Sequence, residues 1–171
     1  MVSASWSARF CRPAGLNSTL VAIALGSNVG DRDAHLDFAV SRLSQLLTDL
    51  RSSSRYDTEP VDVVGDQARY LNAAVVGRTS LEATDLLAAI QQIEEDRGRE
   101  RPYKNAPRTL DLDLILYDDA VMSAPDVVVP HPRFRERLFV LEPLAEIAPG
   151  LVDPKTGLTV RELLHRLPHG T

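Results

Sequence analysis

Apolar runs alternate with helical stripes through residues 20–117. Residues 20–25 form an apolar run closed by Gly26, which predicts a buried strand. The next segment predicts a helix that begins at a cap in Asp31 or Asn28. Its apolar stripe, at helical spacing, consists of Leu36, Val40, Leu43, Leu47 and Leu50. Further strands are predicted over 51–58, 70–76 and 109–117.

A second helix is expected between the last two of these strands. Thr79 and Glu82 are spaced as a capping box, apolar residues follow at helical spacing, and Gly98 can end the helix. Beyond residue 117 we expect an apolar strand at 127–129, another that starts at Phe139, and a C-terminal helix. The order of strand, helix, strand, strand, helix and strand predicts an α+β, ferredoxin-like sandwich. Its βαββαβ core would form a central antiparallel sheet with a C-terminal appendage.

Length and composition limit the class of protein. The chain has 171 residues, which suits one domain. We interpret residues 1–19 as a poorly ordered extension and 20–171 as a single domain. Cys11 is the only cysteine, which excludes an internal disulfide and a cysteine-rich zinc site and fits a cytoplasmic protein. No apolar run is long enough to span a membrane. The net charge of −5 disfavours nucleic acid, so a phosphate site would need a local basic patch or a metal.

The strongest chemical signal is a pair of acidic residues in the predicted strand 109–117. Strict alternation places Leu110, Leu112, Leu114 and Leu116 on one face, and Asp111, Asp113, Ile115 and Tyr117 on the other. The two carboxylates would then lie roughly 7 Å apart at Cα. Hard oxygen ligands of this kind suit Mg²⁺, which keeps waters and adds substrate phosphates. A solvated strand face is an equally simple interpretation of the spacing alone.

A basic loop precedes this strand and supplies Arg99, Arg101, Lys104 and Arg108. Such side chains bind phosphate oxygens, although they could instead neutralise the neighbouring acids. His131 lies between two prolines and could bind a phosphate or serve in packing. Tyr70 and Phe139 are each as suited to a core as to stacking. Asn72 shares a strand face with Tyr70 and could bind the edge of a heterocycle.

Four segments in order resemble the 6-hydroxymethyl-7,8-dihydropterin pyrophosphokinase family, from about residue 20 to the C-terminus. They are Ala24-Leu-Gly-Ser-Asn-Val-Gly30, Tyr70-Leu-Asn-Ala-Ala-Val75, Pro107-Arg-Thr-Leu-Asp-Leu-Asp-Leu-Ile-Leu116, and Val129-Pro-His-Pro132 with Phe139. The resemblance implies a Mg²⁺-dependent diphosphotransferase of folate biosynthesis. It would transfer pyrophosphate from ATP to 6-hydroxymethyl-7,8-dihydropterin and release AMP. We expect a cytoplasmic monomer that binds these small molecules and neither nucleic acid nor a membrane.

The resemblance also implies roles for individual residues. Asp111 and Asp113 match the aspartates that hold two Mg²⁺ ions. Tyr70 and Phe139 match aromatics that sandwich the pterin, Asn72 matches the asparagine at its edge, and Thr58 begins a loop that contacts it. Arg99 and Arg108 match catalytic arginines that hold the ATP phosphates. Further ATP-binding positions are expected at Gln91, Glu94, Leu114, His131 and Arg137.

The sequence departs from the family pattern at four positions. Asn105 and Ala106 replace the usual Trp-Gly or Asn-Gly, Pro132 replaces an aromatic residue, and Glu59 stands where many members have proline. These departures bear on loop closure and on adenosine contacts. Two alternatives also stand: an RNA-binding or ligand-sensing module, which this fold also supports, and a family member that has lost activity. The first would show basic and aromatic residues on its strands, where this chain has Asp-Leu-Asp.

Overall fold

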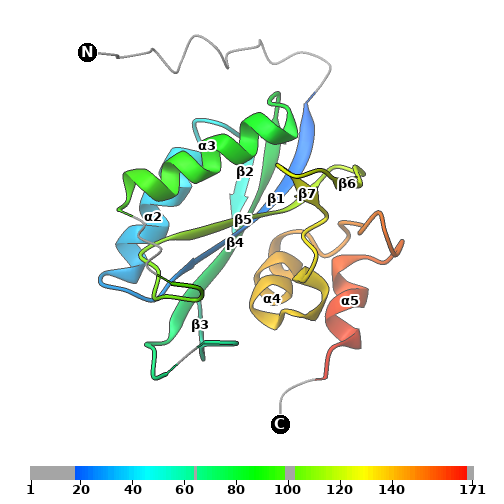
Figure 1. Cartoon of the computed structure of the whole chain (residues 1–171). Helices are drawn as coiled ribbons and strands as arrows, with labels where there is room; N and C mark the ends of the chain where they lie inside the picture. The colour runs from blue at the N-terminus through cyan, green and yellow to red at the C-terminus, as the bar shows by residue number, and fades with distance from the viewer. Residues whose placement is uncertain (1–17, 64, 99–102, 169–171) are drawn as a thin grey trace, which may run out of the picture.

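A computed structural model describes residues 18–63, 65–98 and 103–168 (Figure 1). A central sheet carries helices on both faces, and the C-terminal third of the chain lies against one face of this sheet. The elements are β1 (Thr19–Ser27), α2 (Arg32–Leu43), β2 (Thr48–Ser52), β3 (Tyr56–Thr58), β4 (Tyr70–Thr79), α3 (Ala83–Asp96), β5 (Asp111–Tyr117), β6 (Met122–Ser123), β7 (Val128–Val129), the 3₁₀ helix η1 (Phe134–Glu136), α4 (Leu138–Ile147) and α5 (Val160–Arg166).

The main sheet has the order β2-β4-β1-β5, with β3 also paired to β4, and every pairing is antiparallel. The strands predicted over 20–25, 70–76 and 109–117 are confirmed as β1, β4 and β5. The strand predicted over 51–58 is two short strands, β2 and β3, which pair with different parts of β4. The structure therefore confirms a mixed α and β fold built on an antiparallel sheet.

Two apolar clusters fill the two sides of this sheet. On one side Val21, Ile23 and Leu25 of β1 pack with α2 and α3. On the other side Ala22 and Ala24 pack with α4 and α5. The alternation follows from the period of a strand, because successive side chains point to opposite faces. The segment expected to be an appendage thus supplies one whole layer of the core.

The expectation of a strand at Phe139 is wrong, because Phe139 lies in the first turn of α4. A short apolar run does not by itself distinguish a buried strand from a buried helix. The run here buries Val140, Leu141 and Leu144, which share one helical face against the sheet. Pro143 also lies inside this helix.

Two predictions about helix ends also need correction. The stripe predicted to reach Leu50 stops at Leu43, and Leu50 lies in β2. Leu47 is still buried, because the turn after α2 returns its side chain to the same cluster. The capping box at Thr79 is absent: Glu82 is the N-cap of α3, and the Thr79 hydroxyl accepts from the amide of Leu81.

Other local signals are confirmed. The Asp31 carboxylate accepts from the amide of Ala34 and caps α2. Gly98, at a φ of +79°, directly follows Arg97, the C-cap residue of α3. A reciprocal capping box joins Thr159 and Glu162 at the start of α5.

Strict alternation in β5 is broken by a β-bulge. Leu110, Leu112 and Leu114 face α2 and α3 as predicted, but Ile115 and Leu116 both face α4 and α5. The register with β1 shifts at this point, since Ala22 pairs with Leu116 and Ile23 with Leu114. Leu116 and Tyr117 therefore lie on faces opposite to those expected.

Candidate active site

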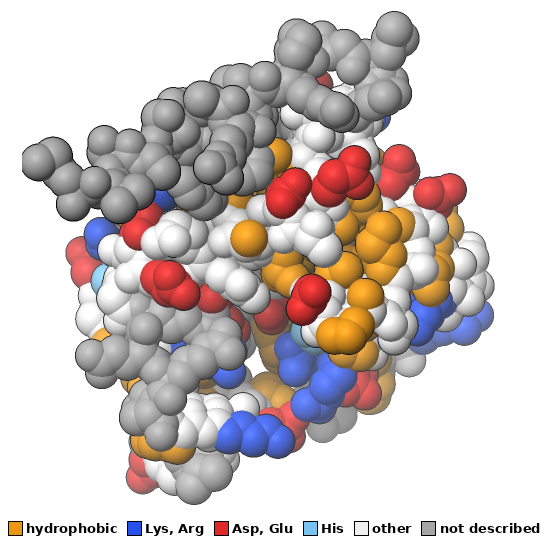
Figure 2. Space-filling model, turned by 45° about the horizontal axis from the view of Figure 1, so that its top comes forward, with side chains coloured by type: hydrophobic (Ala, Val, Ile, Leu, Met, Phe, Trp, Pro, Cys, Tyr) orange, Lys and Arg blue, Asp and Glu red, His pale blue; other side chains and the backbone are white. Residues whose placement is uncertain are grey.

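A cleft of about 880 Å³ opens on the side of the sheet that carries α4. In Figure 2 the surface is hollowed below the centre of the view, and Lys or Arg side chains gather at the margin of the hollow. The cleft brings together eight of the predicted site residues: Thr58, Tyr70, Asn72, Arg108, Asp111, Asp113, Arg137 and Phe139.

The floor of the cleft is set by strand register. Gly26 pairs with Asn72 of β4 on one side and with Asp111 of β5 on the other, and Ala24 pairs in the same way with Ala74 and Asp113. A Cβ atom on Gly26 would lie 3.1 Å from the Asn72 side-chain oxygen. A small residue in β1 therefore leaves space above the sheet between the amide and the carboxylates.

The paired aspartates lie on the cleft wall as the spacing predicts. Their side chains are partly buried, with 18% of Asp111 and 35% of Asp113 exposed. Arg108 Nη1 lies 2.5 Å from Asp111 Oδ2, and Arg137 Nη1 lies 4.0 Å from Asp113 Oδ2. Two acids and two arginines thus converge, which is the combination that metal-assisted phosphate binding requires.

The donor set fits Mg²⁺ bound together with a substrate. Within the described residues, no group of three or more His, Cys, Asp and Glu could hold a metal ion. Two carboxylates on an open wall suit a metal that completes its coordination with water and phosphate oxygens. They do not suit a zinc-type cage made only of protein ligands.

The opposite side of the cleft is aromatic and amide-lined. The Asn72 amide donates to the Thr58 hydroxyl at 2.6 Å, which fixes its orientation. Tyr70 begins β4 directly opposite Thr58, and burial raises the pKa of the Tyr70 hydroxyl. Phe139 enters from α4, and the guanidinium of Arg137 lies 5.5 Å from its ring centre. A flat, polar-edged molecule matches this surface.

His131 is near the cleft but is not part of its lining. Its amide donates to Ile115 O at 2.8 Å, which ties the segment after β7 to β5. Burial, together with the positive charges of Arg137 and Arg133, lowers the pKa of His131 to about 4, and Asp111 opposes them. The ring nitrogen Nδ1 accepts from the amide of Arg133 at 3.1 Å. The neutral imidazole consequently carries its proton on Nε2.

The remaining predicted nucleotide residues lie outside the cleft or outside the described chain. Gln91 is exposed on α3, and Leu114 is buried in the cluster beneath α2 and α3. Glu94 is only 2% exposed, and its carboxylate accepts from the amide of Leu112 at 2.7 Å. Arg99 and Arg101 lie outside the described residues.

Two loops meet above the cleft through residues that sequence reasoning did not single out as a site. Gln67 donates to the carbonyl of Asn105 at 2.9 Å, and Asn105 donates to the carbonyl of Asp62 at 2.7 Å. Asp62 in turn pairs with Arg133 at 2.9 Å. Asn105 has a φ of 60°, a conformation that asparagine tolerates better than most residues. Nothing in the sequence pattern signalled that these residues are neighbours.

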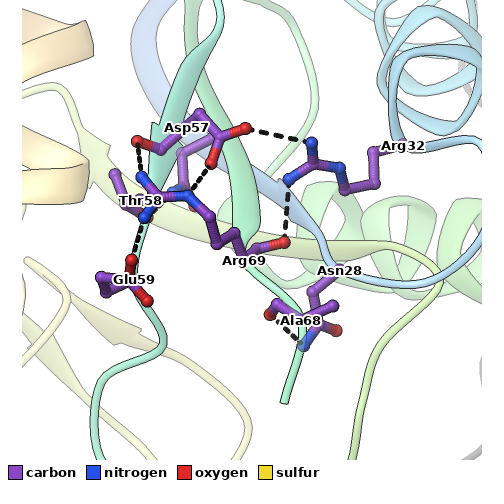
Figure 3. A network of polar contacts seen from close by, with 8 residues as sticks. Asn28, Arg32, Asp57, Thr58, Glu59, Ala68 and Arg69 are labelled. Carbon is purple, nitrogen blue, oxygen red and sulfur yellow. Dashed lines mark hydrogen bonds and ion pairs between the residues drawn. The ribbon is translucent and has the colours of Figure 1, made fainter.

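An ionic network holds the base of the first loop (Figure 3). Asp57 accepts from Arg69 at 2.5 Å and from Arg32 at 3.0 Å. Arg69 also pairs with Glu59. Glu59, which stands where many family members have proline, therefore forms an ion pair with Arg69 that joins the two ends of the loop.

Comparison with known proteins identifies the family. The model of the family described as 7,8-dihydro-6-hydroxymethylpterin-pyrophosphokinase (HPPK) matches residues 22–149. The 2-amino-4-hydroxy-6-hydroxymethyldihydropteridine pyrophosphokinase of Bacillus subtilis is 50% identical over 127 residues, covering 73% of this chain and 75% of its own. The protein of the same name from Synechocystis is 39% identical over 147 residues, covering 85% and 74%.

A solved structure extends the likeness to the fold. The wild-type HPPK-DHPS of Plasmodium falciparum with pterin and p-hydroxybenzoate superposes with a TM-score of 0.69 at 14% identity. The match covers 88% of this chain and 42% of that one, so this chain spans less than half of the Plasmodium protein. No helix in the described ranges is long and apolar enough to cross a membrane. From the family match and the bacterial relatives together, the chain belongs to the HPPK family of pyrophosphokinases of folate synthesis.

Proposed function

We propose that this chain transfers pyrophosphate from ATP to the hydroxymethyl group of 6-hydroxymethyl-7,8-dihydropterin, and that both substrates meet in the cleft above Gly26. The observation that carries the proposal is the row formed by Asn72, Gly26 and Asp111 across three adjacent strands. The amide that we propose for the heterocycle and the carboxylate that we propose for the metal are separated by two strand spacings, about 10 Å.

The proposed reaction is an in-line displacement. The pterin hydroxyl oxygen forms a bond to the β-phosphorus of ATP, the bond from that phosphorus to the oxygen of the α-phosphate breaks, and AMP leaves. The hydroxyl proton passes to solvent. Asp111 and Asp113 would hold two Mg²⁺ ions, which would supply charge neutralisation at the transferred group. Positioning by the surrounding residues accounts for much of the rate in phosphoryl transfer.

Three cationic or donor side chains support the phosphate assignment. Arg108 pairs with Asp111 in this structure. The guanidinium of Arg108 could instead bind a phosphate group through two hydrogen bonds when ATP is present. Arg137 lies near Asp113 from the side of α4. His131, which is uncharged at pH 7 in the free protein because its pKa is about 4, would donate its Nε2 proton to a phosphate oxygen. Arg99 is proposed to act with Arg108.

The pterin would lie between Tyr70 and Phe139, with its edge against Asn72. The Thr58 hydroxyl occupies the amide nitrogen of Asn72, so the amide oxygen is turned to accept from ring N–H groups. Contacts of Gln91, Glu94 and Leu114 with ATP stay a prediction.

The strand order β2-β4-β1-β5 supports a ferredoxin-like layout. We also propose that the protein is a monomer in the cytoplasm.

The test is release of AMP from ATP, Mg²⁺ and 6-hydroxymethyl-7,8-dihydropterin. We expect Asp111→Ala to lower kcat by about 100-fold or more, because it removes an interaction with charge in the transition state. Asp119→Ala is the matched control, since this carboxylate is exposed in the turn after β5 and lies outside the cleft. An Asp111→Ala enzyme with near-normal AMP release would refute the metal assignment. A folded wild-type protein that releases no AMP would leave only a binding role.

A further inference from the structure

Asn28 is a buried amide at the turn between β1 and α2, and it contacts two segments that are remote in sequence. It is 4% exposed. Its backbone amide donates to Arg108 O at 3.0 Å, and its side-chain oxygen accepts from Arg108 N at 2.8 Å. Both backbone groups of Arg108 are therefore bound by one residue. This fixes the main chain three positions before Asp111.

The nitrogen of the same side chain is directed to the other loop. Asn28 Nδ2 lies 3.2 Å from Gln67 Oε1 and 3.3 Å from Ala68 O. Arg32, one turn further along, donates to the carbonyl of Arg69 at 2.9 Å. Figure 3 shows the Asn28 and Arg32 contacts side by side. Two consecutive carbonyls at the end of the loop are therefore bound by the turn after β1 and by the first residue of α2.

Gln67 closes a ring of contacts around the cleft. Its amide nitrogen donates to Asn105 O, three residues before Arg108. The loop that ends at Tyr70 and the segment that ends at Arg108 are thus joined twice, once through Asn28 and once through Asn105. Asn28 is the buried member of this pair, and buried hydrogen bonds cost more to lose than exposed ones.

We propose that Asn28 is a positioning residue for the pyrophosphokinase reaction. Its side-chain oxygen holds the backbone of Arg108 in place, and its side-chain nitrogen holds the end of the loop 58–69. The inference rests on the proposed function, because it assigns Arg108 to ATP and residues 58–69 to the pterin. Only an amide of this length supplies both an acceptor and a donor at the same place. Aspartate has the acceptor alone, and alanine has neither.

This difference gives two variants with separable effects. Asn28→Asp keeps an acceptor for Arg108 N and removes the donor to the loop. We expect it to raise KM for the pterin by about tenfold, because the two long hydrogen bonds from Nδ2 to Gln67 and Ala68 are lost, with little change in KM for ATP. Asn28→Ala also releases Arg108, so we expect kcat to fall by about tenfold in addition.

Hydrogen exchange of the Arg108 amide, measured without substrates, separates positioning from catalysis. We expect about tenfold faster exchange in Asn28→Ala and exchange near that of the wild type in Asn28→Asp. Tyr117→Phe is the control for stability alone. It removes a hydrogen bond of 2.7 Å to Leu81 O on the opposite face of the sheet and should leave both KM values unchanged.

Two results would overturn the proposal. One is a pterin KM within twofold of the wild type in folded Asn28→Asp. The other is an Arg108 amide that exchanges in Asn28→Ala as slowly as in the wild type. If the wild type makes no AMP, the proposed function fails by itself, and the exchange measurement still decides whether Asn28 holds Arg108.

Discussion

The ion pair between Arg135 and Asp153 joins η1 to the turn before α5, and its two partners should respond differently to substitution. Asp153 is fully buried, whereas 24% of the Arg135 side chain is exposed. The carboxylate accepts from Arg135 at 2.5 and 2.8 Å, from the amide of Lys155 at 3.1 Å and from the hydroxyl of Thr156 at 2.7 Å. Arg135→Ala leaves a buried carboxylate without its cation. Asp153→Asn leaves an arginine that can reach water.

The expected magnitudes follow from this asymmetry. Removal of one partner of a buried pair costs about 3–5 kcal/mol, and the partial exposure of Arg135 places Arg135→Ala at about 3 kcal/mol at pH 7. Asp153→Asn keeps an acceptor for the arginine and for Thr156. We therefore expect it to cost about 1.5 kcal/mol, the lower range for hydrogen bonds to a charged group.

The pH dependence supplies an independent sign. Burial alone would raise the pKa of Asp153, but the bonds from Arg135, Thr156 and the Lys155 amide outweigh it and lower the pKa below 3.8. Without Arg135, burial has less opposition, and the pKa should rise above its ordinary value. A carboxyl group with a raised pKa lowers the free energy of unfolding at neutral pH, and this loss disappears as the pH falls and the group is protonated. The free-energy gap between wild type and Arg135→Ala should hence narrow from pH 7 to pH 4.

Urea unfolding followed by circular dichroism at several pH values measures both quantities. Arg161→Ala, which removes an exposed arginine from α5, controls for the loss of a positive charge. A larger cost for Asp153→Asn than for Arg135→Ala would refute the reasoning that a buried carboxylate without its cation costs more than an exposed arginine without its anion. A difference in free energy of unfolding between wild type and Arg135→Ala that widens as the pH falls would also refute it.

Three further changes test separate features. Thr159→Ala removes the capping box of α5 and should lower the free energy of unfolding by about 1 kcal/mol in urea titrations, while Lys155→Ala, in an exposed turn, should not. Gly26→Ala places a Cβ 3.1 Å from the Asn72 oxygen and should raise KM for the pterin by about tenfold in the AMP assay; an unchanged KM would contradict the close fit of the floor. The Tyr56 hydroxyl donates to Glu146 at 2.6 Å, and this bond raises the pKa of Tyr56 to about 12. Because the folded pKa exceeds the unfolded value of 10.0, the stability advantage over Tyr56→Phe should be full below pH 10 and decline as the pH rises towards 12; urea unfolding across this range measures it, and an advantage that grows with pH would contradict it.

The elements that were predicted correctly are those whose signals are local. The apolar run at 20–25 could only be buried, and Asp31 and Thr159 mark helix starts through their own side chains. The spacing of Asp111 and Asp113 placed both on one face because the first half of β5 is regular. The segments around Tyr70 and Arg108 indicated the family through the identity and order of their residues alone.

The features that escaped prediction depend on contacts between distant segments. The run that starts at Phe139 is apolar enough for either a strand or a helix, and the choice is made by the sheet face that it must cover. Asn28 gave only the signals of a turn and of a helix cap, besides its place in a segment that indicated the family. Its role depends on Arg108 and Gln67, which are 80 and 39 residues away.

The bulge in β5 shows how such contacts build the cleft. Had the strand alternated throughout, Leu116 would face α3, and Ile115 alone would meet the C-terminal layer. The register shift instead directs both towards Ala22, Val140 and Leu141. This gives α4 an apolar base beside the two aspartates, on the same face of the sheet. Because α4 is anchored there, its N-terminal end brings Arg137 and Phe139 to the cleft that Asn72 and Tyr70 also line. One extra residue in a strand thereby connects the packing of the C-terminal helices to the geometry at which the substrates are proposed to meet.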